Sequence, residues 1–320
     1  MDEDLPLFRK FPNMSFYKRF DEISAKLTKL FRTKNSLKET AAEFDELSRT
    51  QDEENPFECG LVALAKFGEM QCWQKIEDKQ KTVRTAVKAA RLFIKSANFN
   101  FSISRNLRDT WSDPLADGLH CYRVAADVLK GDSKPNLAVV LLLELGKTEA
   151  QFDLLHYAGN TYEEAANLCL DQHLSPPLLF DSVFNCVDCY SRADRLDLAL
   201  LVVDNVQNKL GEGSNDQISS SQLMKAQLTN IKILKAQLLL SAFKYADCIA
   251  YAEKNLEEGV AQLFKQLCDA TKSNQIAVID SIINQARSSN YFTDLQISLF
   301  ERHHFLLSKS IEAAYAELAQ

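Results

Sequence analysis

Apolar residues follow one another at helical spacing along most of the chain. The first series continues at steps of three or four residues and ends in an adjacent pair: Phe16, Phe20, Ile23, Leu27, Leu30 and Phe31. This spacing places them on one face of an α-helix. No segment of more than a few residues shows the alternation of apolar and polar positions that a strand requires. The pattern predicts an all-α protein of roughly twelve to fourteen helices of ordinary length.

Cap residues and prolines predict where several helices begin. We expect a capping box, in which two side chains satisfy open backbone donors reciprocally, at three places: Ser36 with Glu39, Thr161 with Glu164, and Thr293 with Gln296. A residue followed by proline at the first helical position predicts four further starts: Asn55-Pro56, Asp113-Pro114, Lys134-Pro135 and Ser175-Pro176. We expect one helix to end near Asn98 and another at Gly146.

Two segments resemble copies of one helical-hairpin repeat. "YAGNTYEEAANLC" starts at Tyr157, "YSRADRLDLALLV" starts at Tyr190, and their alanines, Ala165 and Ala199, lie 34 residues apart. This is the period of tetratricopeptide (TPR) repeats, in which a small residue lets two antiparallel helices approach closely. The positions that fit the repeat, and that we expect to pack between helices, are Phe152, Ala165, Cys169 and Pro177 in the first copy and Cys186, Tyr190, Ala199 and Val203 in the second.

The repeat predicts a TPR-like helical-hairpin solenoid, whose stacked units expose an extended surface for gripping another protein. The alternative is a helical bundle with alanine-rich crossings. At 320 residues the chain exceeds the roughly 250–300 at which one compact core stops growing. We expect a flexible tail over 1–12, a single solenoid over 13–320, and an exposed loop at 211–221, "GEGSNDQISSS".

Charge is distributed unevenly along the chain. Nine Lys and Arg lie between Arg9 and Lys38 against two acidic residues, a balance of +7, so the formal net charge of -7 leaves -14 for the remainder. An acidic chain is not typical of nucleic-acid binders. The first helix has five basic residues: Lys18, Arg19, Lys26, Lys29 and Arg32. Three interpretations stay open for them: a solvated face, a docking surface for an acidic partner protein, and contact with an anionic membrane.

Motifs for chemistry are incomplete. "LGKTEA" has Leu141 where a phosphate-binding loop needs glycine. Cys186-x-x-Cys189 has metal-ligand spacing without a second pair, and we interpret all eight cysteines as reduced core thiols in a cytosolic protein. The adjacent His303 and His304 point to different helix faces. We therefore expect no enzymatic activity, no cofactor and no metal site. Without a long apolar run, we expect a soluble, cytoplasmic protein.

An ordered series of segments carries a family resemblance from Phe16 to Ile311. The segments are "FYKRFDEISAKLTKLFRTKNSLKETAAEFDELSRT", "AVKAARLFIKSA", "DPLADGLHCYRVAADVLK", "LAVVLLLELG" and the region from Tyr157 to Leu168. Together they resemble the huntingtin-associated protein of about forty kilodaltons, also called the factor VIII intron 22 protein family, which has helical repeats. One departure is "GEGSNDQISSS", which stands where the vertebrate pattern has a longer proline-rich insertion.

The resemblance implies a scaffold that binds and stabilises huntingtin, a giant HEAT-repeat protein, as a one-to-one heterodimer. It also implies an adaptor that links an early-endosomal Rab GTPase to huntingtin and changes endosome motility, with locations in the cytoplasm, at early endosomes and in the nucleus. The alternative is a SNAP-type TPR-like adaptor in vesicle fusion, since that family shares the repeat style.

Overall fold

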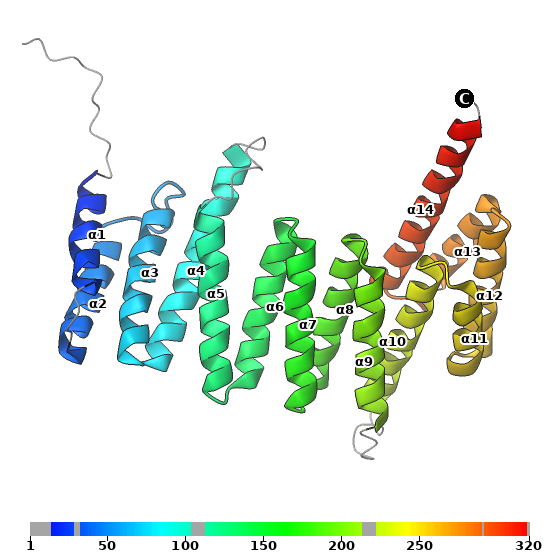
Figure 1. The fold of residues 1–320 in the computed structure, drawn as a ribbon, viewed down its shortest axis with the longest axis horizontal. Coiled ribbons are helices and arrows are strands. Elements are labelled where there is room, and N and C mark those ends of the chain that lie inside the picture. Colours follow the sequence, from blue (N-terminus) through cyan, green and yellow to red (C-terminus); the bar gives the residue numbers. More distant parts are fainter. Residues whose placement is uncertain (1–13, 29–32, 104–112, 213–221, 290, 319–320) are drawn as a thin grey trace, which may run out of the picture. The chain divides into compact units, whose positions relative to one another are not determined.

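The computed structural model describes residues 14–28, 33–103, 113–212, 222–289 and 291–318. These residues form fourteen α-helices and no strand, which confirms the predicted all-α, helical-hairpin class (Figure 1). They divide between two compact units, Met1–Phe152 and Asp153–Gln320. The predicted tail over 1–12 lies outside the described residues, and so does the predicted loop except for residues 211 and 212, which belong to a helix.

The described part of unit 1 contains six helices, in which neighbours along the chain pack against each other. They are α1 (Met14–Leu27), α2 (Lys34–Ser48), α3 (Cys59–Ile76), α4 (Lys79–Ile103), α5 (Asp113–Gly131) and α6 (Pro135–Gln151). The predicted apolar stripe of α1 is confirmed where it is described, because Phe16, Ile23 and Leu27 are buried against α2 and α3. Gly68 lets Phe44 reach α3, since a Cβ there would lie 2.6 Å from Phe44 Cε1.

Eight helices make up unit 2 in the part of it that the structure describes. They are α7 (Leu155–Asp171), α8 (Pro176–Arg192), α9 (Leu196–Glu212), α10 (Gln222–Ser241), α11 (Tyr245–Asn255), α12 (Glu258–Lys272), α13 (Ile276–Ser288) and α14 (Asp294–Leu318). Sequential helices again pack together, and the long α14 returns to pack on α10 as well as on α13. Phe264 of α12 and Phe300 of α14 meet in its core with their ring centroids 5.8 Å apart.

The buried positions repeat after 41 residues, so the predicted 34-residue register is wrong. Pro135 and Pro176, the first residues of α6 and α8, are 41 residues apart, and each buried residue of α6 has a buried counterpart 41 residues later in α8. By the same shift Ala199 of α9 corresponds to Ala158 of α7 and not to Ala165. The longer period arises because the helices have seventeen residues each and the turns between them add three or four.

Several predicted helix starts are confirmed. Helices α6 and α8 begin at Pro135 and Pro176. The capping box of α14 forms as expected: Thr293 N donates to Gln296 Oε1 at 2.9 Å, and Gln296 N donates to Thr293 Oγ1 at 3.3 Å.

Other predicted boundaries are wrong. Ser36 lies inside α2, whose N-cap is Thr33, and Thr161 lies inside α7. Helix α3 begins at Cys59 because the Asn55 side chain instead closes a turn, accepting from Phe57 N at 3.1 Å. Two helices also pass their predicted ends without interruption: α4 continues beyond Asn98, and α6 continues beyond Gly146.

Left-handed residues other than glycine lie between many of the helices. Among the described residues, seven have positive φ: Glu77, Ser133, Asp153, His173, Asp194, Phe243 and Asn274. Asp153 and Asp194, at φ 63° and 60°, are again 41 residues apart. None of these seven turn residues is a glycine, so glycine was a poor guide to where the helices end.

Candidate functional site

The basic residues of α1 differ in their surroundings. Lys18 and Arg19 are exposed, whereas Lys26 is half-buried and pairs with Glu43 of α2. Lys29 and Arg32 lie outside the described residues. Lys18 and Arg19 are therefore the two members of the predicted docking surface whose exposed charge the structure describes.

Most of the predicted repeat-packing residues belong to the core of unit 2. Six are buried in α7, α8 and α9: Ala165, Cys169, Cys186, Tyr190, Ala199 and Val203. Phe152 instead lies half-buried in the turn after α6, with its ring centroid 5.1 Å from that of Phe101, and Pro177 is exposed. A further small residue, Gly159 of α7, allows a close contact with α8, because the ring of Tyr190 lies against it.

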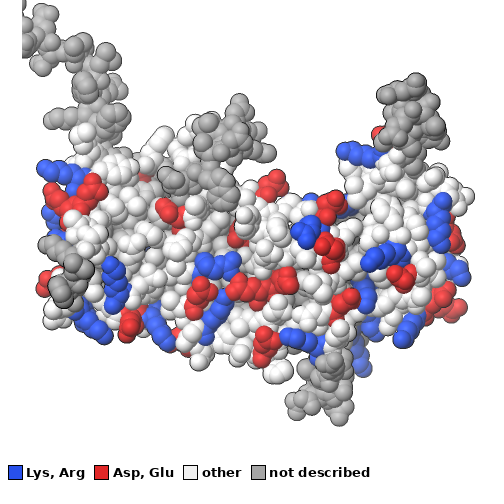
Figure 2. All heavy atoms as spheres, viewed as in Figure 1, with Lys and Arg blue, Asp and Glu red and all other residues white. Residues whose placement is uncertain are grey.

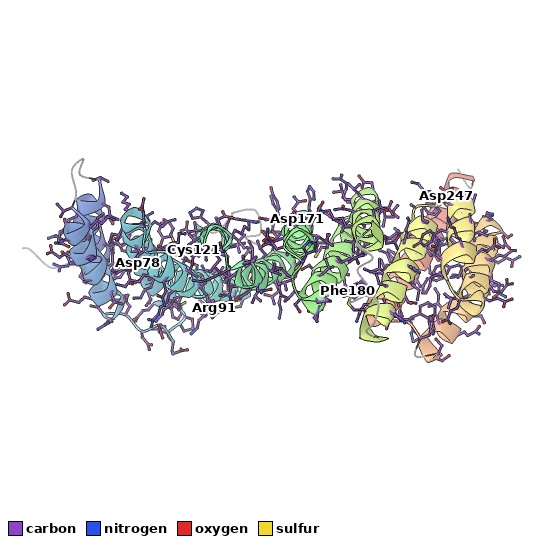
Figure 3. All side chains as sticks on the ribbon, turned by 90° about the horizontal axis from the view of Figure 1, so that it is seen from below. Asp78, Arg91, Cys121, Asp171, Phe180 and Asp247 are labelled. Atoms are coloured by element: carbon purple, nitrogen blue, oxygen red, sulfur yellow. The ribbon has the colours of Figure 1, made fainter. Side chains whose placement is uncertain are left out.

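The cysteines lie in the core. All eight are buried free thiols, including Cys121 in unit 1 (Figure 3). Cys186 Sγ donates to Gly159 O at 3.4 Å, and burial raises the pKa of this thiol. A protonated, buried thiol is a poor nucleophile and a poor metal ligand. Among the described residues no group of three or more His, Cys, Asp or Glu could hold a metal ion.

The two adjacent histidines diverge as expected. His303 is buried near Thr271, with Nε2 3.3 Å from Thr271 Oγ1, whereas His304 Nε2 lies 3.2 Å from Asp280 Oδ1. The "LGKT" segment is the interior of α6, so its backbone N–H groups are not presented as a phosphate-binding loop would present them.

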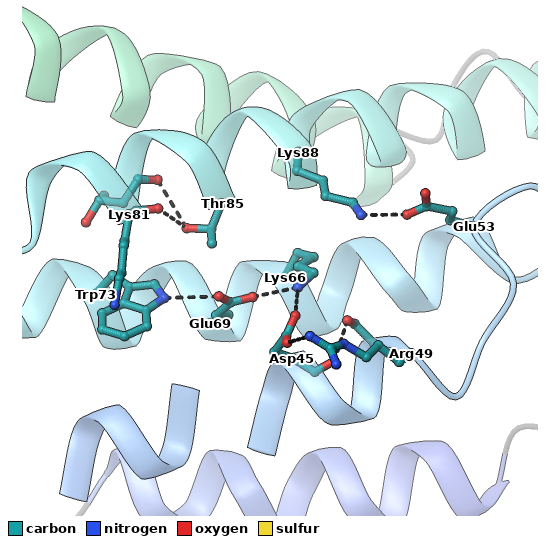
Figure 4. A network of polar contacts seen from close by, with 11 residues as sticks. Asp45, Arg49, Glu53, Lys66, Glu69, Trp73, Lys81, Thr85 and Lys88 are labelled. Atoms are coloured by element: carbon teal, nitrogen blue, oxygen red, sulfur yellow. Dashed lines mark hydrogen bonds and ion pairs between the residues drawn. The ribbon is translucent and has the colours of Figure 1, made fainter. Parts of the chain in front are cut away.

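A polar groove runs between α2 and α4 over α3 in unit 1, and we call it the charged groove (Figure 4). It has a volume of about 690 Å³. Charged side chains of both signs line it from all three helices: Asp45 on α2 and Arg49 at its C-cap, Lys66 and Glu69 on α3, and Lys81, Arg84 and Lys88 on α4.

The floor of the charged groove is a buried ion network on α3. Lys66, only 7% exposed, pairs with Asp45 and with Glu69 Oε2, the latter at 2.8 Å. Trp73 Nε1 donates to Glu69 Oε1 at 3.1 Å. Burial alone would raise the pKa of Asp45, but hydrogen bonds and charge from Lys66 and Arg49 outweigh it and lower that pKa. Each charged group of the floor has an oppositely charged partner, and this pairing offsets the cost of burying the charges away from water.

One wall of the charged groove begins a line of five basic residues along α4, which we call the basic stripe. Its members follow at alternating steps of three and four residues: Lys81, Arg84, Lys88, Arg91 and Lys95. This spacing sets them on one face of the helix. Lys81, Arg84 and Lys88 line the groove, and Arg91 and Lys95 continue the stripe beyond it.

The far end of the basic stripe already binds carboxylates of this chain. Lys88 pairs with Glu53 at 2.7 Å, and Lys95 pairs with Glu54 at 2.8 Å. Arg91 donates two bonds to Glu144 of α6, at 2.8 and 2.9 Å. Hydrogen bonding from Lys88, and then its charge, lower the pKa of Glu53 below the ordinary value of a glutamate.

The near end of the stripe is more open. Lys81 lies over the ring of Trp73, 3.9 Å from its centroid, and its ammonium is 3.9 Å from Asp78 Oδ2. Arg84 is exposed and makes no ion pair with any residue that the structure describes. This stripe was not predicted, although the three-four spacing of its basic residues is visible in "KTVRTAVKAARLFIKSA".

A second groove in unit 1 is aromatic, and it adjoins α1. With a volume of about 490 Å³, its lining includes Tyr17, Phe57, Leu64, Phe93, Phe99 and Pro114. Phe57 is 73% exposed and Tyr17 50% exposed. The rings of Phe57 and Phe99 meet edge to face with centroids 4.8 Å apart. Tyr17 directly precedes Lys18 and Arg19, so this aromatic groove and the predicted basic surface share α1.

Elsewhere the charges are interspersed. Figure 2 shows acidic and basic side chains alternating over one face, without a large region of a single sign. Among the helices that the structure describes, none combines the length and apolar character needed to cross a bilayer.

No protein-family model matches the chain, and no curated protein matches it either.

Proposed function

We propose that this protein is a non-catalytic scaffold that binds a large helical-repeat protein, and that the partner is huntingtin. The observation that carries the proposal is the open aromatic groove, with Phe57 73% exposed at its edge. The choice of huntingtin comes from the residue resemblance alone.

Exposed aromatic residues beside cations are the chemistry of binding hot spots. A buried aromatic side chain removes on the order of 150–250 Å² from water, so leaving Phe57 and Tyr17 uncovered has a cost that a partner would relieve. Lys18 and Arg19, next to Tyr17, add charge that would speed encounter with an acidic surface. Both features lie within unit 1 and share α1.

On this proposal the complex is a one-to-one heterodimer in the cytoplasm. Its role as an adaptor between an early-endosomal Rab GTPase and huntingtin is part of the same proposal. An extended helical partner would cover a large interface, on the order of several thousand Å² for an obligate complex.

Affinity purification from native cells followed by mass spectrometry tests the partner. We expect one very large polypeptide, huntingtin, to co-purify at one-to-one stoichiometry. Recovery of vesicle-fusion machinery with stimulation of its ATPase would favour the SNAP-type alternative. The absence of any giant co-purifying chain would contradict the proposal, and turnover of a substrate by the isolated protein would contradict its non-catalytic part.

Association kinetics with purified huntingtin test the α1 surface. Reversing Lys18 and Arg19 to glutamate should slow association and flatten its dependence on salt, because both side chains are exposed cations. The control reverses two exposed lysines of unit 2, Lys225 and Lys254. If the association rate and its salt dependence match those of the control, Lys18 and Arg19 belong to a solvated face and do not dock the partner.

A further inference from the structure

We propose that the open end of the charged groove binds a segment of a partner protein rich in glutamate and aspartate, held by Lys81 and Arg84. This inference rests on the proposed function, since it assumes a protein partner. It adds the chemistry of the segment and the residues that would hold it.

The basic stripe itself shows which ligand it accepts. Three of its five members bind carboxylates, and two of these come from consecutive residues of one loop, Glu53 and Glu54. Their partners Lys88 and Lys95 are seven residues apart, about 10 Å along the axis of α4. An acidic run in non-helical conformation therefore already lies along the stripe, and it leaves the N-terminal end of α4 uncovered.

The uncovered end has cations on both sides of the groove. Lys81 and Arg84 of α4 line the groove. Across from them Arg49, the C-cap residue of α2, lines it as well, and its guanidinium pairs with Asp45 (Figure 4). The two carboxylates between them, Asp45 and Glu69, are balanced by two cations, because both pair with the buried Lys66 and Asp45 also pairs with Arg49. A carboxylate entering here meets Arg84, which has no ion pair among the described residues, and Lys81, whose nearest carboxylate is 3.9 Å away.

The site favours spaced carboxylates over a dense polyanion. The chain has a formal net charge of -7, and Glu53 stands at the groove edge beside Lys88. These charges oppose a nucleic acid, whose affinity depends on many phosphate contacts. In a peptide the carboxylate side chains are separated by neutral amide groups. That spacing suits a site of two or three cations that lie about one helical turn apart.

Binding of fluorescein-labelled oligoglutamate peptide to the purified full chain tests the inference. We expect binding that weakens as salt is raised. Lys81→Glu with Arg84→Glu should lower the affinity by about tenfold or more. The matched control, Lys34→Glu with Lys38→Glu, makes the same charge change at exposed sites of α2 outside the groove and should bind like the wild type. Circular dichroism on both pairs checks that folding is unchanged.

A second variant tests competition by the chain's own loop. Glu53→Gln with Glu54→Gln frees Lys88 and Lys95 and should tighten oligoglutamate binding, by about threefold to tenfold if each freed cation acts as an exposed ion-pair partner. Affinity unchanged in this variant would contradict the claim that loop and peptide share the stripe.

Three results would overturn the inference: no oligoglutamate binding by the wild type, equal binding by the Lys81→Glu/Arg84→Glu variant and its control, or tighter binding of inorganic phosphate or a single-stranded oligonucleotide. If huntingtin co-purifies while the peptide fails to bind, only the groove assignment is wrong. If the peptide binds as expected and huntingtin does not co-purify, the groove assignment stands and the choice of partner is wrong.

Discussion

Gly159 of α7 allows a close contact between α7 and α8 in unit 2. The Tyr190 ring of α8 lies directly over it, is fully buried, and places its hydroxyl 2.7 Å from both Asn160 Oδ1 and Glu163 Oε2. The ring is thus fixed at both ends, by packing and by hydrogen bonds. A side chain at 159 would have to displace it.

Replacing Gly159 with alanine should therefore destabilise the protein. The new Cβ would lie 2.5 Å from Tyr190 Cδ1. Overpacking of this kind costs about 1–3 kcal/mol, against about 1 kcal/mol gained in helix propensity. Urea unfolding followed by circular dichroism measures the difference. Gly259→Ala is the control, because nothing lies within 4 Å of a Cβ there, and it should be neutral or stabilising. A Gly159→Ala variant as stable as Gly259→Ala would contradict the steric argument.

His303 of α14 is buried with an incomplete set of hydrogen bonds. Its Nε2 lies 3.3 Å from Thr271 Oγ1, while its Nδ1 has no partner among the described residues. Burial, with a smaller contribution from the charge of His304, lowers the pKa of His303 to about 4. The folded protein therefore holds this ring neutral, whereas an unfolded chain would protonate it near pH 6.5.

This difference predicts a loss of stability in mild acid. Because the folded pKa lies below the unfolded value, the unfolded state binds the proton first, and stability falls as pH drops from about 6.5 towards 4. Between pH 7 and 5 the loss from His303 should be about 2 kcal/mol. Urea midpoints at both pH values measure it. His303→Gln should lose most of this dependence, while His156→Gln, at an exposed site of α7, should keep it. An unchanged dependence in His303→Gln would show that the ring is not responsible.

At the scale of elements, the start of α14 is tied to α10 as well as to its own cap. Gln296 closes the capping box with Thr293, donates from Nε2 to Asn230 O at 3.2 Å, and accepts at its backbone O from Gln237 Nε2 at 2.8 Å. The cap therefore orients a side chain that also connects two helices of unit 2.

Removing the cap should weaken this connection. Thr293→Ala should lower the free energy of unfolding by about 1 kcal/mol, since the N-terminal donors of α14 lose an acceptor. Thr293→Ser retains the hydroxyl and should restore most of the stability. Thermal unfolding of the three proteins gives the comparison. Equal destabilisation by serine and alanine would indicate that the threonine methyl group, and not its oxygen, is what matters.

The accuracy of sequence reasoning varied with the type of helix end. Starts marked by proline were placed correctly at Pro135 and Pro176, because proline fits only the first turn. Capping boxes were less reliable. The pattern that begins at Thr161 lies inside α7, where Thr161 is a buried residue of the helix interior and not a cap. Glycine failed at Gly146, which is buried in α6 as a small packing residue.

The candidate site was predictable only in part. The exposed Lys18 and Arg19 followed from the apolar stripe opposite them. The charged groove did not, since Asp45, Lys66 and Lys81 come from three helices whose faces meet only on folding. The spacing of the basic stripe was visible in the sequence, but its open end depends on which carboxylates fold against it.

For the molecule as a whole, the hairpin class followed from the sequence while its register did not. Ala165 and Ala199 are both buried alanines, and the alanines that correspond by structure are Ala158 and Ala199. Small residues are common enough on packed helices to mimic a 34-residue period. Helix length, which sets the true 41-residue period, depends on turn residues that the repeat motif does not include.

The distribution of thiols gives a prediction for the intact chain. All eight cysteines are buried, and burial raises the pKa of Cys121 to about 12, with the charge of Asp117 adding to it, and that of Cys169 to about 11. Native protein should react slowly with dithionitrobenzoate, and all eight thiols should react at once in denaturant. Cys186→Ser with Cys189→Ser should leave the zinc content unchanged. A thiol that reacts rapidly in the native state would contradict this account.

The turn residues with positive φ imply that substitutions in the turns could make the protein more stable. Phe243, at φ 58°, adopts a conformation that L-residues with bulky side chains avoid, and its ring packs 5.8 Å from His303. Glycine would remove the backbone strain there but also the ring. At Asp153 and Asp194 the side chains are more exposed, so a consensus or design approach could exchange these turns more freely. Selection for thermal resistance would be expected to act on such turns before it altered the helices.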